Sequence, residues 1–314
     1  MTRLVIGRLL AAVPVVLLVA TLVFFLAQLG TTDPAGVMLG VDATPAALAA
    51  KRAELGIDRP VVVQYADWLG DAVRGDLGTN WFNGESVTRE LASRLPVTLA
   101  MAFGGLLVAT VAGAGLGVFA ALRAGRWQDR VITVVASLGI ALPSFWVALL
   151  LAYYVGVRWR WLPAVWPSGG PGSVTGWIEA LVLPCLALGC AAAAAIARQT
   201  RSSVIGVLQR DYVRAALARG FTVRRVVTHH VLRNAAIPVV TLIGFQASAL
   251  IGGSLFVEFI FNVPGLGSYG VDAILRGNVP AVLGFVMVTA LAVVLVNIAL
   301  DLSYAVLNPK VRPA

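Results

Sequence analysis

Residues 97–122 read VTLAMAFGGLLVATVAGAGLGVFAAL, a stretch that contains no charged side chain. About 20 apolar residues in a helix are enough to cross the ~30 Å hydrocarbon core of a bilayer. Similar apolar runs occupy residues 9–29, 131–157, 181–197, 237–257 and 281–307. None of these runs shows the ten-residue alternation that is typical of a transmembrane barrel. The sequence therefore predicts an all-α, polytopic membrane protein with six transmembrane helices.

The composition supports a membrane protein and excludes several other classes. Hydrophobic residues make up 59% of the 314-residue chain and charged residues only 12%, whereas soluble domains carry about 25% charged residues. So little charge cannot cover a water-soluble protein of this size, and the high hydrophobicity excludes a disordered chain. Two cysteines and two histidines are too few for a disulfide framework or a four-ligand zinc site.

The distribution of charge predicts how the chain is oriented. The chain carries 24 Lys and Arg against 15 Asp and Glu, a net charge of +9. Of these, 15 basic but only two acidic residues fall in segments 1–8, 123–130, 198–236 and 308–314. By contrast, 9 basic and 12 acidic residues fall in segments 30–96, 158–180 and 258–280. Because Lys and Arg mark the cytoplasmic side, we expect a multi-pass protein of the plasma (inner) membrane with both termini in the cytoplasm.

The apolar runs contain almost no ionisable side chains, which limits the functions open to the chain. Glu258 follows the fifth run and Asp301 lies within the sixth. Ion-coupled carriers usually need buried ionisable residues, so any energy coupling is expected from outside the membrane. A secondary carrier or channel that works alone remains an alternative. An intramembrane serine hydrolase is disfavoured, because it needs a histidine inside the bilayer and both His229 and His230 lie in a cytoplasmic segment.

The outer loop at 30–96 is long and contains signals for two helices. Thr44 followed by Pro45 is typical of a helix start, and Gly56 is a suitable end for that helix. After Pro60, apolar residues return at helical spacing at Val61, Tyr65, Trp68, Leu69 and Ala72. This periodicity predicts a second helix, which either caps the bundle or contacts a partner.

The cytoplasmic segment at 198–236 is long for a connection between two spans. An apolar stripe predicts one helix over its first part: Val204, Ile205, Leu208, Tyr212 and Ala215. Gly220 is the expected left-handed end of that helix. A second short helix is expected over 221–237, up to Pro238 at the start of the fifth span. Such a pair can transmit motion from a soluble partner, although a basic amphipathic pair can also simply bind anionic headgroups.

This segment resembles the EAA loop of ABC importer permeases, whose pattern is EAA, three residues and Gly. Here Arg214-Ala215-Ala216 is followed three residues later by Gly220, with Arg in the place of Glu. The form is similar to that of the dipeptide/oligopeptide/nickel permease family. The matching residues are Asp211, Tyr212, Arg214, Gly220, Arg224, Arg225, Val226, His230, Leu232, Arg233, Asn234, Ala235, Ile237 and Pro238.

The resemblance extends over nearly the whole chain, to the B-type subunit of that family. In order, the further matches are Asp33-Pro34-Ala35, the stretch 55–60, Gln64-Tyr65, Trp68-Leu69, the stretch 75–78, Arg94-Leu95-Pro96 with Thr98-Leu99, Glu258-x-x-Phe261-x-x-Pro264-Gly265-x-Gly267, Ala273 and Pro280. Asn278 departs from the pattern, because many relatives carry Asp there.

The resemblance implies a type I ABC importer permease fold, with one permease domain over 1–314. It implies that the chain is a non-catalytic subunit that forms half of a translocation pathway for dipeptides or oligopeptides. The implied partners are a second homologous permease subunit, two cytoplasmic ATPase subunits and an extracytoplasmic substrate-binding lipoprotein. No cofactor is expected on this chain, because ATP and Mg would bind the ATPase subunits. The same role for a nickel chelate, glutathione or haem remains open.

The resemblance also implies site residues. The ATPase-coupling loop would use Arg214, Ala215, Ala216, Arg219, Gly220, Arg224 and Arg225. The outer mouth or gate would use Glu258, Phe261, Pro264, Gly265 and Gly267. The contact with the binding protein would use Tyr65, Trp68 and Asp76.

Several other motifs favour ordinary structural roles. The only lysines are Lys51 and Lys310, and neither belongs to a phosphate-binding P-loop. The GxGxxG at 265–270 follows Pro264 and lacks the acidic residue of a dinucleotide site. Adjacent His229 and His230 face different sides of a helix and suit a metal poorly. Nothing in the chain predicts nucleic-acid binding.

Small residues within the spans predict packing. Cys185 and Cys190 are expected to act as small buried hydrophobes. Gly113-x-Gly115-x-Gly117 is typical of closely packed membrane helices.

Overall fold

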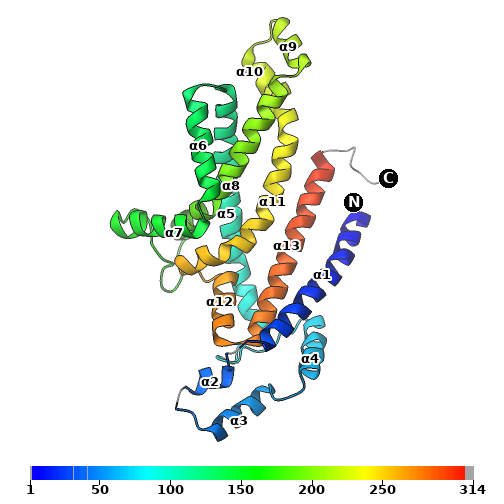
Figure 1. Cartoon of the computed structure of the whole chain (residues 1–314), viewed down its shortest axis with the longest axis vertical. Coiled ribbons are helices and arrows are strands. Elements are labelled where there is room, and N and C mark those ends of the chain that lie inside the picture. Colours follow the sequence, from blue (N-terminus) through cyan, green and yellow to red (C-terminus); the bar gives the residue numbers. More distant parts are fainter. Residues whose placement is uncertain (1, 31, 41, 308–314) are drawn as a thin grey trace. The chain divides into compact units, whose positions relative to one another are not determined.

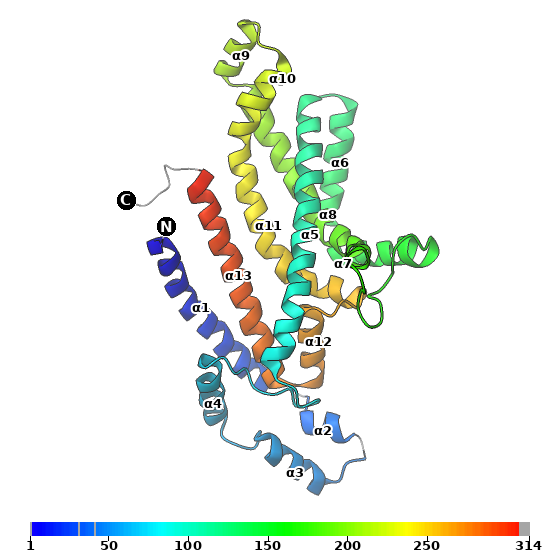
Figure 2. The same cartoon turned by 180° about the vertical axis from the view of Figure 1, so that it is seen from behind.

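The structure is a computed structural model that describes residues 2–30, 32–40 and 42–307, and this part of the chain is helical apart from its loops and one β-bridge, between Thr79 and Ser86 (Figures 1 and 2). The α-helices are α1 (Thr2–Gln28), α2 (Pro34–Leu39), α3 (Pro45–Leu55), α4 (Val61–Val73), α5 (Val87–Leu122), α6 (Trp127–Ala141), α7 (Ser144–Leu151), α8 (Val174–Leu208), α9 (Asp211–Ala218), α10 (Val223–Val226), α11 (Leu232–Ile260), α12 (Leu266–Arg276) and α13 (Val279–Leu307). Two π-helical stretches are η1 (Ala152–Arg158) and η2 (Val227–Val231). The all-α prediction is confirmed.

Within the described residues, five helical segments are long and apolar enough to cross a membrane. They are Leu10–Gln28, Val87–Leu122, Val174–Leu208, Val223–Ile260 and Val279–Leu300. A sixth candidate consists of two helices, Trp127–Ala141 and Ser144–Arg158, joined at a sharp bend. The predicted spans therefore correspond to five continuous helices and one broken pair.

The third predicted span, 131–157, corresponds to the broken pair. The chain bends by 102° between α6 and the helix formed by α7 and η1. Pro143 explains the break, because proline lacks a backbone N–H and disfavours helical geometry in the residue before it. That residue, Leu142, has an extended backbone at φ −80° and ψ 123°. Figure 1 shows α7 turned away from the axis of α6.

The described chain forms two compact units, one of residues 1–98 with 264–314 and the other of residues 99–263. Helix α5 contributes its first turns to one unit and the rest to the other. In the first unit, α13 packs against α1 and α12, as Figures 1 and 2 both show. Its core consists of Ala72, Leu77, Val87, Leu91, Leu266, Tyr269, Ala273, Ala281 and Val282.

The outer loop of the first unit folds as the sequence predicts. The Thr44 hydroxyl accepts a hydrogen bond from the Ala47 amide at 3.3 Å and caps α3. Gly56 ends that helix in the left-handed conformation at φ 71°. Arg52 on α3 donates to Asp33 at 2.7 Å, and this hydrogen bond lowers the pKa of Asp33. Helix α4 follows Pro60, as expected.

Helix α8 is the centre of the second unit, where it packs against α11, α6 and α7. Its contact with α5 is made through glycines. A Cβ at Gly113 would lie 2.6 Å from the Ala193 carbonyl oxygen, and one at Gly117 would lie 2.6 Å from that of Ala197. Gly115 faces open space, so Gly113 and Gly117 form the contact, four residues apart.

The cysteines of the second unit lie on α8. Cys185 is buried, and Cys190 is half-buried. A Cβ at Gly104 would lie 2.5 Å from the Cys185 sulfur, so this thiol occupies space that a glycine on α5 leaves free. The prediction of a small buried hydrophobe is confirmed for Cys185.

Candidate functional site

The predicted coupling loop lies at the end of the second unit, where α9 and α10 extend beyond α8 and α11 (Figure 1). The predicted single helix through this region is wrong. Helix α8 ends at Leu208, two residues break the helix, and α9 begins at Asp211. The break shifts the buried face, so that Val213 is fully buried whereas Tyr212 is 44% exposed. A periodicity that assumes one continuous helix cannot be carried across such a break.

A small apolar core holds α9 in place. We call it the loop core, and its buried members are Ala121, Val204, Val213, Val226, Val231 and Ala235. These residues come from six different elements: α5, α8, α9, α10, η2 and α11. Val213 is the one fully buried side chain among those described on α9, and half-buried Ala216 packs against the loop core beside it. Burial of a valine side chain stabilises its contact by roughly 1.5–3 kcal/mol.

Gly220 makes the turn that follows α9. Its φ of 84° lies in the left-handed region, as the sequence predicts, and this region is unfavourable for residues with a Cβ. A Cβ at this position would have open space around it. The requirement for glycine therefore comes from the backbone conformation and not from crowding.

The second predicted short helix, over 221–237, is wrong as a separate element. Beyond Gly220, helical residues run from Val223 to Ile260 without interruption and form one of the candidate spans. Pro238 lies inside α11 and does not begin it. The five residues of η2 adopt the wider π-helical form. Helix α9 is thus connected to a candidate membrane helix by the short turn at Gly220.

A hydrogen bond joins α9 to the same long helix. The Asn234 side-chain amide donates to the Tyr212 hydroxyl at 3.0 Å and to the His230 carbonyl oxygen at 2.8 Å. Both Tyr212 and Asn234 match the family pattern, but no sequence feature predicts that they pair. Val213 was not predicted as a site residue at all, because it lies outside the assumed stripe.

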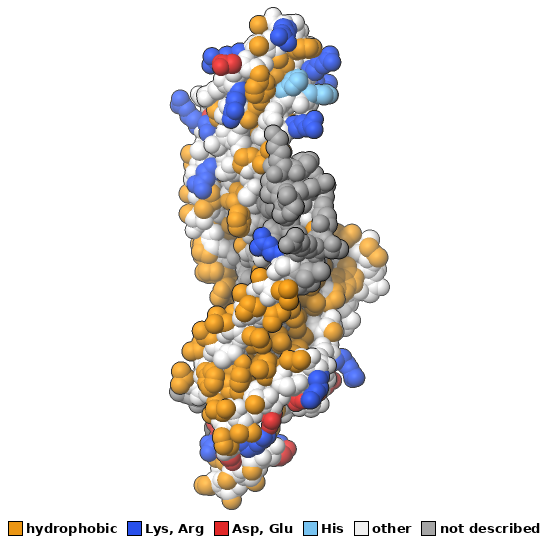
Figure 3. Space-filling model, turned by 90° about the vertical axis from the view of Figure 1, so that its right-hand side faces the viewer, with side chains coloured by type: hydrophobic (Ala, Val, Ile, Leu, Met, Phe, Trp, Pro, Cys, Tyr) orange, Lys and Arg blue, Asp and Glu red, His pale blue; other side chains and the backbone are white. Residues whose placement is uncertain are grey.

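The solvent-exposed surface of the predicted coupling loop is basic. Arg214, Arg219, Arg224, Arg225 and Arg233 are all exposed. Figure 3 shows blue arginine side chains gathered around the two pale-blue histidines at this end. The Arg225 guanidinium lies over the Phe221 ring at 5.2 Å. Among the exposed residues are also Ala215 and Val223, so the surface combines positive charge with small apolar contacts.

The loop shows no metal-binding arrangement. His229 and His230 are exposed, and His229 Nδ1 lies 2.9 Å from the Thr228 hydroxyl. Throughout the described part of the chain, no group of three or more His, Cys, Asp or Glu side chains is arranged to hold a metal ion.

The predicted outer-mouth residues are divided between the two units. Glu258 is fully buried in α11 and accepts a hydrogen bond from the Ser254 hydroxyl at 2.9 Å. The carbonyl oxygen of buried Phe261 accepts from the Trp166 amide at 2.8 Å. Pro264 begins the segment of the other unit, in which Gly265 precedes α12 and Gly267 is buried in its first turn. A gating role for these residues stays a prediction.

The predicted contact residues for a binding protein lie on or near α4. Tyr65 packs against Phe24 of α1, with ring centroids 5.1 Å apart, and its hydroxyl hydrogen-bonds to Thr21. Trp68 is half-buried beside Tyr65. Asp76 is exposed, and its carboxylate accepts from the Gly78 amide at 2.9 Å. Tyr65 thus fastens α4 to α1, and a contact of Tyr65, Trp68 or Asp76 with a partner stays a prediction.

A buried polar cluster near the outer loop was not predicted. The Glu90 carboxylate accepts hydrogen bonds from Asn80 and Asn83, each at 2.9 Å, and from the Tyr269 hydroxyl at 2.8 Å. Asn278 donates to Asn80 at 2.6 Å. Burial, and then the nearby Glu90 carboxylate, raise the pKa of Tyr269, so this hydroxyl stays protonated as a donor. We call these five residues the Glu90 cluster.

Comparison with known proteins identifies the family. Residues 113–313 match the family described as "Binding-protein-dependent transport system inner membrane component". Residues 1–102 match the N-terminal domain of such membrane components. The chain belongs to this family. It is a multi-pass inner-membrane permease, and the matched region contains α9, Gly220 and the whole loop core.

Relatives align with the permease along almost its full length. It is 38% identical over 312 residues to a glutathione transport system permease protein of Salmonella choleraesuis, with 99% of each chain covered. It is 36% identical over 312 residues to a putative peptide transport system permease protein of Brucella abortus, again with 99% of each covered. A putative peptide permease protein of Brucella ovis is 40% identical over 322 residues, with the same coverage.

A solved structure supports the fold. A chain of the MetNI methionine ABC transporter, in an inward-facing conformation, is similar with a TM-score of 0.53 at 18% identity. The match covers 70% of the permease and 96% of that chain. The predicted ABC importer permease fold is confirmed. Together with the family match, this makes the chain a non-catalytic permease subunit of a binding-protein-dependent ABC importer, a system that implies ATPase and binding-protein partners.

Proposed function

We propose that the permease pairs with a second, homologous permease subunit and forms half of a translocation pathway for small peptides. An extracytoplasmic binding lipoprotein would deliver the peptide, and two cytoplasmic ATPase subunits would drive its passage. The observation that carries this proposal is the identity of 36–40% to peptide and glutathione permeases, over 99% of the chain. Both termini of the permease would lie in the cytoplasm, in agreement with the excess of Lys and Arg in the segments beside them.

The coupling loop supports the part of the proposal that concerns the ATPase subunits. Helix α9 is short, its buried face is occupied by Val213, and its other described side chains are exposed or half-buried. It would dock in a groove of an ATPase subunit through Ala215, Ala216 and the flanking arginines Arg214 and Arg219. Arg224 and Arg225 extend the same basic surface beyond Gly220. A groove that accepts it would carry carboxylates, because charge complementarity favours such a contact.

The relatives support short peptides as the substrate class. Glutathione is itself a tripeptide, so the glutathione and peptide permeases share one substrate chemistry, that of short peptides. We therefore place di- and tripeptides, including glutathione, ahead of nickel chelates and haem. Substrate selection would lie mainly in the binding protein. The permease itself binds neither ATP nor Mg in this account.

Reconstitution in liposomes tests the proposal. The permease would be assembled with the second permease, the ATPase subunits and the binding protein from its own organism, and uptake of labelled peptides would be measured. We expect uptake that requires both ATP and the binding protein, and that stops when the ATPase subunits carry a substitution that blocks hydrolysis. Glutathione, a nickel chelate and haem serve as competing substrates in the same assay.

Two outcomes would contradict the proposal. Peptide uptake by the permease alone, without nucleotide, would assign a secondary carrier. Uptake of only a nickel chelate or haem would keep the ABC importer but remove the peptide pathway.

A further inference from the structure

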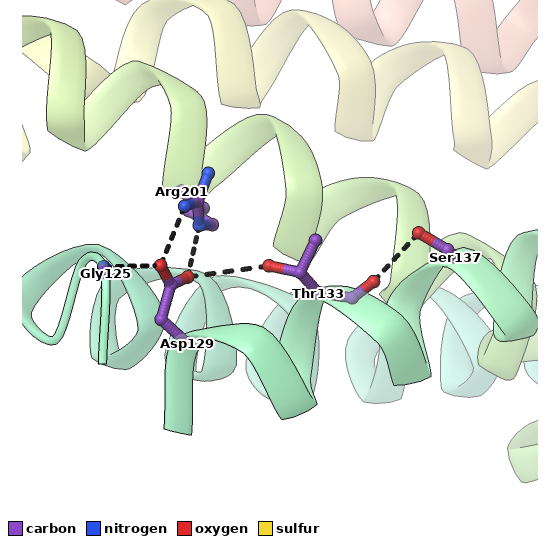
Figure 4. A network of polar contacts seen from close by, with 5 residues as sticks. All are labelled: Gly125, Asp129, Thr133, Ser137 and Arg201. Carbon is purple, nitrogen blue, oxygen red and sulfur yellow. Dashed lines mark hydrogen bonds and ion pairs between the residues drawn. The ribbon is translucent and has the colours of Figure 1, made fainter. Parts of the chain in front are cut away.

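A buried ion pair joins α6 to α8 just before the coupling loop (Figure 4). Arg201 donates from Nε and Nη2 to the two carboxylate oxygens of Asp129, at 2.5 and 2.8 Å. The Asp129 side chain is 3% exposed and that of Arg201 is 32% exposed. A two-pronged arginine–carboxylate contact of this kind fixes both distance and orientation. The pair therefore links α6 to α8 at this level of the bundle.

The same carboxylate also closes the turn between α5 and α6. The Gly125 amide donates to Asp129 at 2.9 Å, and Gly125 has a φ of 81°. The Thr133 hydroxyl, one helical turn further along α6, lies 3.5 Å from Asp129. Figure 4 shows all of these groups around the one carboxylate. Three residues thus make four hydrogen bonds to the Asp129 carboxylate and hold it in place.

Helix α5 meets α8 at the same level. Thr200 of α8 directly precedes Arg201. A Cβ at Gly117 of α5 would lie 2.6 Å from the Cβ of Thr200. Val204 follows Arg201 by one turn and belongs to the loop core. At this level α8 is thus fixed to α5 through Thr200 and to α6 through Arg201. One turn later it becomes part of the support of α9.

We propose that Asp129 and Arg201 are positioning residues that make α6 move with α8 when the coupling loop is displaced. This role rests on the proposed function, in which ATPase subunits displace α9. A buried carboxylate that loses its cation is strongly unfavourable, so the pair stays closed while the helices move. The displacement then passes along α6 to the bend at Leu142 and Pro143. Through this pair, a displacement of α9 by the ATPase subunits would move α6 and α8 together.

Substitution of the pair tests this role in the reconstituted importer. The variants are Asp129→Asn, Arg201→Lys and the exchange of both residues, and the quantity measured is peptide transported per ATP hydrolysed. We expect this ratio to fall about 3- to 30-fold in Asp129→Asn, in the range typical of residues that couple two sites. Arg201→Lys keeps the charge but loses the second hydrogen bond to Asp129, and we expect a smaller fall in the ratio of peptide transported to ATP hydrolysed. The exchanged pair should recover part of the ratio.

A matched control is the exposed pair on α12. Arg276 donates to Asp272 at 2.8 Å, and both side chains are about half exposed. Exposed pairs of this kind contribute little, so Asp272→Asn should leave the ratio unchanged. If Asp129→Asn and Arg201→Lys reduced only the amount of assembled importer, with a normal ratio in what remains, the pair would be merely structural and the proposal would be overturned.

A cross-link gives a second test that does not remove the pair. A Cβ at Gly139 of α6 would lie 3.0 Å from the Ala194 Cβ of α8, so Gly139→Cys with Ala194→Cys allows a short link in a background without Cys185 and Cys190. If α6 and α8 move together, the oxidised importer transports at the rate of the reduced one. A block on oxidation that reduction reverses would overturn the proposal. Absence of ATP-driven uptake by the unmodified importer would instead count against the proposed function.

Discussion

Two residue positions show how backbone conformation and hydrogen bonding decide what the permease tolerates. Gly220 has a φ of 84° in open space, so its constraint is conformational. Asn278 is buried within the Glu90 cluster and acts as a donor to Asn80, so its constraint is chemical. The first was expected from the sequence, because a glycine at the end of a helix is typical of a left-handed residue. The second was not, because its partner Asn80 lies 198 residues away in the sequence.

The substitution Gly220→Val tests the turn after α9. A β-branched residue in the left-handed conformation costs roughly 1–2 kcal/mol, which favours a different path of the chain and displaces α9. We expect normal insertion in the membrane but loss of ATPase subunits during purification of the complex. Gly206→Val is the matched control, since Gly206 is exposed on α8 without a positive φ. Full retention of ATPase subunits and full transport in Gly220→Val would contradict this account of the turn.

The substitution Asn278→Asp tests the Glu90 cluster. It replaces the donor to Asn80 by an acceptor and adds a second buried carboxylate to the cluster, so we expect a lower melting temperature at pH 8 than in the unmodified permease. Leaving buried polar groups without partners costs about 1–3 kcal/mol. At pH 5 the loss should be smaller, because a protonated acid can donate to Asn80. An equal loss at both pH values would argue against the donor role of Asn278.

At the scale of helices, the sequence predicts some of the helix boundaries that lie at a proline or glycine. It does not predict the boundaries that lie at ordinary helix-forming residues. The start and end of α3 were correctly predicted from Thr44, Pro45 and Gly56. The break between α8 and α9 was missed, because Gln209 and Arg210 are ordinary helix residues. The size of the bend at Pro143, 102°, was not predicted, because a proline marks where a helix can break but not by how much. Pro238 was read as a helix start, yet it is accommodated inside α11.

The valine that anchors α9 gives a prediction at this scale. Val213→Ala removes two methyl groups from the loop core, at about 0.8 kcal/mol each, and so weakens an apolar contact of α9. We expect ATP hydrolysis by the complex to persist while peptide transport falls. Val174→Ala is the control, because Val174 is 78% exposed and lies at the start of α8, away from the coupling loop. Equal transport by the two variants would show that the loop core does not position α9.

The glycine contact between α5 and α8 gives another prediction at the scale of helices. Gly113→Leu and Gly117→Leu place side chains where the backbone of α8 lies within 2.6 Å of a Cβ, so neither side chain fits without separating the helices. We expect both variants to be poorly expressed or to aggregate in detergent. Gly115→Leu, which faces open space, should behave like the unmodified permease in the same size-exclusion analysis. Aggregation of all three variants would instead indicate a general intolerance of bulk on α5.

For the whole molecule, the sequence predicted the class of fold better than the sites. Long uncharged runs predict membrane helices from local physics alone, and the charge pattern predicts their orientation. The Glu90 cluster could not be predicted, because it joins Glu90 to Tyr269, 179 residues further along the chain. The Asp129–Arg201 pair joins residues 72 apart, and neither had a recognisable motif. Contacts of this kind depend on which helices become neighbours, which the periodicity of each helix does not contain.

The central claim is that the permease does not hydrolyse ATP itself, and that ATPase subunits bound to α9 drive its conformational change. The most direct measurement uses Ala215→Cys on the exposed face of α9, in a background without Cys185 and Cys190, with Val73→Cys on α4 as the outer control. We predict that Ala215→Cys cross-links to an ATPase subunit in the assembled importer and is protected from a membrane-impermeant thiol reagent in intact cells, whereas Val73→Cys is labelled. Labelling of Ala215→Cys from outside, with no cross-link to the ATPase, would contradict the account.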